Sequence, residues 1–139
     1  MEKKIPVIGA VIFIIVLIVA LVMLYQPNSA PREVQLTDVD NGNEIEVKKG
    51  QSLVISLDSN PTTGYTWELV EQPDGQILQQ VGEELEFKPE SDRIGAGGTQ
   101  TIRFDVVGVG QTALKIVYHR PWETDVAPER IYYIHVLAR

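Results

Sequence analysis

The chain offers few side chains that could carry out catalysis. It has 139 residues, no cysteine, and two histidines, His119 and His135. The nearest approach to a catalytic cluster is His119 with Asp125 and Glu129, and no serine lies in that stretch. The absence of thiols excludes cysteine nucleophiles, disulfides, iron–sulfur clusters and thiolate zinc sites. We therefore expect no enzyme, no metal centre and no cofactor.

The first of three unusual loops is Asn60-Pro61-Thr62-Thr63-Gly64. An Asn side chain at its start can bond to backbone N–H groups, the proline fixes φ, and the glycine permits a positive φ. The two β-branched threonines are stiff at χ1. These residue types predict a rigid, small and mildly polar tip. An ordinary turn is the alternative, because Asn-Pro and Thr-Gly are common turn dipeptides.

Two further loops have residue types suited to binding. The stretch Ile94-Gly95-Ala96-Gly97-Gly98-Thr99 has three glycines in four positions, which lets its backbone approach a partner closely. A phosphate cradle is a weak alternative, since the chain lacks a Gly-Lys-Ser/Thr motif and no helix is expected to follow. The third loop, His119-Arg120-Pro121-Trp122-Glu123, offers Arg and Trp, which are favoured binding residues. Its alternative is a Trp folded over the end of the domain.

The segments between these loops have the two-residue period of β-strands. Apolar and polar side chains alternate in Leu53–Leu57, Ile102–Val106, Leu114–Tyr118 and Tyr132–Val136. Further strands are predicted at Val34–Thr37, Glu44–Lys48, Thr66–Glu71, Ile77–Val81 and Glu84–Lys88. We therefore predict an all-β domain over residues 34–139, an immunoglobulin-like β-sandwich of two sheets. In a seven-strand version, the first and third loops share one end, and the glycine loop joins them if its strand pair opens there.

The amino-terminal segment predicts a membrane span. The run from Ile5 to Tyr25 is 21 residues without a charge, and a bilayer core of about 30 Å needs about 20 apolar residues. Cleavable signal peptides have shorter apolar stretches and a small-x-small site. We therefore expect residues 1–25 to be a cytoplasmic stub with an uncleaved signal anchor, and residues 26–33 a linker. A long cleaved signal, which would release the domain, is the alternative.

Charge predicts the orientation of this span and excludes one class of partner. Lys3 and Lys4 precede the span, whereas Arg32 beside Glu33 follows it, so the amino terminus is expected in the cytoplasm and the domain outside. After residue 31 the chain has 10 basic and 18 acidic residues. An acidic domain without a basic patch does not suit phosphate backbones, so we expect no nucleic-acid binding.

The three loops together resemble the signature loops of the chagasin family, inhibitors of papain-like cysteine peptidases with an immunoglobulin-like fold. The matching motifs are NPTTG at residues 60–64, GAGG at 95–98 and RPW at 120–122, in the family's order. The resemblance covers most of residues 34–139. It implies a reversible, non-covalent inhibitor that occludes the peptidase cleft and needs no cofactor. We expect the inhibitor domain to be monomeric.

The resemblance also implies roles for individual residues. The first loop, with Thr62 and Thr63 at its tip, would enter the cleft over the catalytic Cys–His pair, and Tyr65 would pack behind it. The glycine loop would place its backbone against one side of the cleft. The third loop would pack against the other side, with Trp122 near the primed subsites. The residues concerned are Asn60, Pro61, Thr62, Thr63, Gly64, Tyr65, Gly95, Ala96, Gly97, Gly98, Arg120, Pro121 and Trp122. The alternative function is an immunoglobulin-like adhesion or sensor ectodomain.

Overall fold

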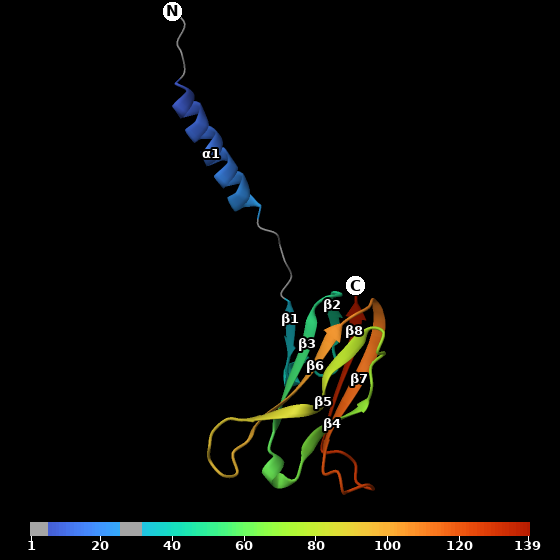
Figure 1. Ribbon diagram of the computed structural model, residues 1–139. Coiled ribbons are helices and arrows are strands. Elements are labelled where there is room, and N and C mark those ends of the chain that lie inside the picture. The colour runs from blue at the N-terminus through green and yellow to red at the C-terminus, as the bar shows by residue number, and fades with distance from the viewer. Residues whose placement is uncertain (1–5, 26–31) are drawn as a thin grey trace, which may run out of the picture. The chain divides into compact units, whose positions relative to one another are not determined.

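A computed structural model describes residues 6–25 and 32–139, which belong to two separate units (Figure 1). The first unit contains one helix, α1 (Val7–Leu24), with no charged residue and no buried residue. It is long and apolar enough to cross a membrane, by length and composition. Pro6 precedes its first residue, where a missing N–H costs no helical hydrogen bond. Lys3, Lys4 and most of the expected linker lie outside the described residues.

The second unit consists of two four-stranded sheets (Figure 1). One sheet has the strand order β1 (Glu33–Leu36), β3 (Ser52–Ser59), β6 (Gly98–Val106) and β5 (Leu78–Pro89). The other has the order β2 (Glu44–Val47), β8 (Arg130–Ala138), β7 (Gly110–His119) and β4 (Thr66–Glu71). The pairs β1–β3 and β2–β8 are parallel, and the remaining pairs are antiparallel. The predicted β domain with two sheets is confirmed, and residues 32–139 contain eight strands and two short 3-10 helices.

The hydrophobic core is built from the inward residues of both sheets. The alternation in the sequence is confirmed, because the alternate apolar residues of the four runs are buried in one cluster. Val54 and Val117, on the opposite faces of their strands, are also buried but lie outside this cluster. The side chains with no more than 1% exposure include Leu53, Ile55, Leu57, Ile102, Phe104, Leu114, Ile116, Tyr132 and Ile134. This core needs no residue of α1, so residues 32–139 have a hydrophobic core of their own.

Strand β5 differs from the prediction. The sequence suggested two strands, Ile77–Val81 and Glu84–Lys88, whereas the structure has one strand from Leu78 to Pro89. Its pairing with β6 shifts register between Val81 and Glu86, and Gly82 in this interval has φ +85°. A bulge absorbs the extra residues without ending the strand. The interruption in the sequence pattern therefore marks an irregularity within one strand.

Strand register places three connections at the same end of the unit (Figure 1). Gly98 pairs with both Ser59 and Pro89, so the first loop begins beside the β5–β6 connection. Thr66 pairs with His119, so the first loop ends where the β7–β8 connection begins. The β1 strand starts at the opposite end, because Glu33 pairs in parallel with Ser52.

Candidate functional site

The first loop is a closed turn held by its own hydrogen bonds. Residues Pro61–Thr63 form a short 3-10 helix, and Gly64 follows with φ +83°. The Asn60 side-chain oxygen accepts the Thr62 N–H at 3.3 Å and the Thr62 hydroxyl at 2.5 Å. The Asn60 backbone oxygen accepts the Thr63 hydroxyl at 2.6 Å. The predicted side-chain bond from Asn60 to the backbone and the positive φ of Gly64 are confirmed, and both threonines are exposed at the tip.

Arg120 connects the third loop to the first. Its Nε donates to the backbone oxygen of Thr63 at 3.1 Å, and its guanidinium carbon lies 4.5 Å from the centre of the Tyr65 ring. A hydrogen bond from Arg120 to Glu123, 3.1 Å long, raises the pKa of the guanidinium further. Partial burial and a hydrogen bond to Glu129 raise the pKa of the Tyr65 hydroxyl. Arg120 therefore stays charged and Tyr65 stays neutral at neutral pH.

One edge of the Trp122 ring packs against Gly64 of the first loop, and most of the side chain is exposed to solvent. Its side chain is 67% exposed. A Cβ added to Gly64 would lie 2.4 Å from the indole Cη2 atom, which shows how closely the ring covers that glycine. The ring is not folded over the end of the core. Pro121 beside it is exposed as well.

The glycine loop divides into an exposed tip and a buried base. Gly95 has φ +82° and open space around it, and Ile94 next to it is fully exposed. Ala96 and Gly97 are half-buried, and the Gly97 carbonyl accepts the N–H of Glu90 at 3.0 Å. Gly98 is buried, and a Cβ there would lie 2.1 Å from the Lys88 carbonyl oxygen. The packing of β5 against β6 thus requires glycine at residue 98.

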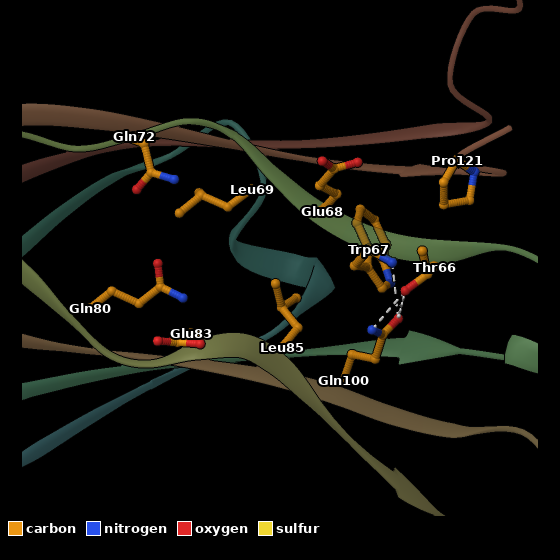
Figure 2. Close-up of a pocket in the computed structure, with 10 residues that line it drawn as sticks. All are labelled: Thr66, Trp67, Glu68, Leu69, Gln72, Gln80, Glu83, Leu85, Gln100 and Pro121. Atoms are coloured by element: carbon orange, nitrogen blue, oxygen red, sulfur yellow. Dashed lines mark hydrogen bonds between the residues drawn. The ribbon is translucent and has the colours of Figure 1, made fainter. Parts of the chain in front are cut away.

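A buried amide beneath the first loop links the two sheets, and the sequence did not reveal it. Gln100 on β6 is 6% exposed. Its Oε1 accepts the Ser59 hydroxyl at 2.7 Å and the Trp67 N–H at 2.9 Å, and its Nε2 donates to the Thr66 hydroxyl at 3.0 Å. Figure 2 shows the bonds to Thr66 and Trp67. Both strands that flank the first loop are therefore held by one side chain.

Two hollows lie near the loops. A groove of about 470 Å³ runs between β4 and β5, and Pro121 is the one predicted site residue among those lining it (Figure 2). A second hollow of about 330 Å³ lies at the base of the first loop and the glycine loop. Its lining residues are Asp58, Ser59, Asn60, Glu90, Gly97, Gly98, Tyr118 and Arg130. The exposed predicted residues therefore lie on loops at one end of the unit with hollows beside them, whereas Gly98 is buried at the base of its loop.

The histidine cluster considered from the sequence has different partners in the structure. His119 Nε2 lies 2.6 Å from Glu68 Oε2, a residue 51 positions away. Glu129 instead interacts with Tyr65. Among the residues that the structure describes, no group of three or more acidic or histidine side chains could hold a metal ion.

Comparison with known proteins identifies the family of this chain. The sequence pattern described as "Chagasin family peptidase inhibitor I42" matches residues 46–136. The chain belongs to the chagasin family. Chagasin of Trypanosoma cruzi is 35% identical in an alignment of 92 residues, and the match covers 63% of this chain and 82% of that protein. Residues 46–136, which match the family, contain all three loops of this chagasin-family protein.

Solved structures share the fold of the second unit. A cysteine protease inhibitor from Entamoeba histolytica has a TM-score of 0.67 at 25% identity and covers 79% of this chain and 100% of its own. A protein described as PbICP-C, solved in complex with falcipain-2, has a TM-score of 0.53 at 17% identity and covers 82% and 96% of the two chains.

Proposed function

We propose that this chagasin-family protein inhibits papain-like cysteine peptidases reversibly and without a covalent bond, by occluding the active-site cleft with its three loops. The observation that carries the proposal is the closed turn of residues 60–64 at the centre of an edge formed by all three loops. The similarity to chagasin and to cysteine protease inhibitors supports it. We also assign the second unit, residues 32–139 and called the β unit below, to the immunoglobulin-like class of sandwiches.

The closed turn explains how the first loop could occupy a peptidase cleft without being cut. A papain-like enzyme cleaves an extended strand whose carbonyl faces the thiolate. Pro61–Thr63 is a 3-10 turn, closed by hydrogen bonds from Thr63 N–H to Asn60 O and from Gly64 N–H to Pro61 O. To become extended, the loop would have to break these bonds. Because the loop is ordered before binding, little conformational entropy is lost on association.

The two flanking loops would widen the contact on either side of the cleft. Gly95 and Ala96 would bring backbone to one side, and Trp122 and Pro121 would pack on the other. An interface of about 1,600 Å² in total is typical of protease–inhibitor complexes. Gly98 contributes indirectly in this proposal, since its backbone is part of the sheet at the base of the loop.

The proposal is tested by titrating papain and a cathepsin L-like enzyme with residues 32–139, and with the full chain in detergent micelles. We expect stoichiometric, reversible loss of activity. A matched variant with one glycine inserted between Thr62 and Thr63 should inhibit less and be cleaved in the loop. If the wild-type unit does not inhibit at micromolar concentration, the peptidase proposal is wrong. The adhesion or sensor function is then the one to test.

We also propose that α1 is a signal anchor, with the amino terminus cytoplasmic and the β unit, from about residue 34, outside. Its 18 apolar residues support this, since they extend about 27 Å at 1.5 Å per residue. The chain enters the unit at Glu33, at the end away from the loops. Protease protection of the full chain in inverted membrane vesicles tests the orientation, and the size of the mature protein shows whether the span is cleaved.

A further inference from the structure

Tyr118 connects the core of the β unit to the start of the first loop. Its hydroxyl oxygen accepts the backbone N–H of Asn60 at 2.9 Å, across 58 residues of sequence. The side chain is 7% exposed. Its ring stacks on Tyr65, with centroids 5.3 Å apart, and contacts Trp67, with centroids 5.0 Å apart. The ring is therefore held from several sides, which fixes the position of the hydroxyl.

The Asn60 N–H is the polar group that ties the start of the turn to the rest of the unit. The carbonyl and side-chain oxygens of Asn60 bind groups inside the loop, at Thr62 and Thr63. The N–H instead points away from the loop, towards the buried Tyr118. At the other end of the turn, Arg120 binds the Thr63 carbonyl. The turn is thus held at its start by Tyr118 and at its end by Arg120.

Arg130 reinforces the position of Tyr118 from the neighbouring strand. Its guanidinium carbon lies 5.7 Å from the centre of the Tyr118 ring and 5.0 Å from that of Trp67. The guanidinium also donates to Asp38 at 2.6 Å and to the Asp58 carbonyl at 3.4 Å. The Asp58 carbonyl also accepts the Trp67 indole N–H at 2.8 Å. Side chains from β4, β7 and β8 therefore meet at the base of the first loop.

We propose that Tyr118 is a positioning residue for inhibition, because its hydroxyl holds the start of the first loop in the closed turn that a peptidase does not cleave. This role rests on the proposed function. Without the hydroxyl, the partly buried Asn60 N–H loses its partner, and such a group is costly to leave unpaired. The start of the loop then gains freedom that must be lost again on binding. The loop also reaches extended, cleavable conformations more often.

The test is the variant Tyr118→Phe, which keeps the ring and its stacking and removes one hydroxyl. The matched control is Tyr133→Phe, which removes a hydroxyl that lies 3.0 Å from His135 on the exposed face of β8. The wild type and both variants would be prepared as residues 32–139. For each we would measure the inhibition constant against papain and the melting temperature. Cleavage after prolonged incubation with papain would be followed by mass spectrometry. Amide hydrogen exchange at Asn60 reports directly on the bond.

We expect Tyr118→Phe to raise the inhibition constant about tenfold, which corresponds to about 1.4 kcal/mol. The first loop should become slowly cleavable, and Asn60 exchange should accelerate, whereas Tyr133→Phe should change none of these. The proposal is overturned if Tyr118→Phe lowers the melting temperature but inhibits like the wild type and stays uncut. It is also overturned if Tyr133→Phe has the same effects. If the wild-type unit does not inhibit at all, the failure belongs to the proposed function.

Discussion

Gly64 links the conformation of the first loop to the position of Trp122, and Gly64→Ala tests this link. Two effects contribute. An alanine at φ +83° is strained, by about 1–2 kcal/mol for a left-handed conformation. In addition, its Cβ would lie 2.4 Å from the indole, so the ring must move by about 1 Å or more to reach an ordinary contact distance. Strain lowers stability, whereas displacement of the ring lowers affinity.

The matched control for strain alone is Gly50→Ala. Gly50 has φ +94° with nothing within 4 Å of an added Cβ. It lies just before the first residue of β3, Ser52, at the end of the unit away from the loops. Both variants should lose about 1–2 kcal/mol of unfolding free energy in urea titrations. We expect only Gly64→Ala to weaken papain inhibition, by about 1–3 kcal/mol, or roughly 5- to 150-fold.

A double-mutant cycle separates the two effects. In a Trp122→Ala background there is no indole to displace, so Gly64→Ala should cost much less inhibition than it does in the wild type. Equal inhibition constants for Gly64→Ala and the wild type would refute the argument. An undiminished effect of Gly64→Ala in the Trp122→Ala background would also refute it, because the loss would then come from the first loop alone.

Three further variants test other parts of the structure. Trp122→Ala should weaken papain inhibition by about 1–3 kcal/mol, whereas Val109→Ala, an exposed side chain in the β6–β7 turn, should not. Gln100→Leu should lower the unfolding free energy by about 3 kcal/mol in urea, because it leaves three buried or half-buried polar groups unpaired; the exposed Gln111→Leu should have little effect. Tyr132→Phe should raise the unfolding free energy by about 1 kcal/mol, since the Tyr132 hydroxyl is buried without a hydrogen-bond partner among the described residues. Burial, with Asp40 and Asp38 nearby, raises the pKa of Tyr132 above its usual value of about 10. The wild type should therefore lose stability as pH rises above about 10, and Tyr132→Phe should lose less. Melting temperatures of the two proteins that fall in parallel over this pH range would contradict the argument.

Much of the fold could be predicted because it depends on local chemistry. The alternation in Leu53–Leu57 and Tyr132–Val136 places apolar side chains on one face whatever the strand partner, and these residues are buried. The turn at residues 60–64 could be predicted for the same reason, since Asn60 bonds to groups two and three residues away. The break in β5 was misjudged, because a bulge and a strand end look alike in a sequence.

The sequence by itself determined the residue types of the three loops, the inward faces of the strands and the apolar segment at the amino terminus. The predicted sandwich already placed the first and third loops at one end, whereas only the tertiary structure decided that the glycine loop joins them and which side chains support them. Gln100, Tyr118 and Arg130 bind groups near the first loop from 33 to 72 residues away. A period of two shows which face a side chain occupies, but not which strand lies beside it. The partners of a buried hydroxyl, amide or guanidinium therefore depend on strand order and register, which arise only when the two sheets have formed.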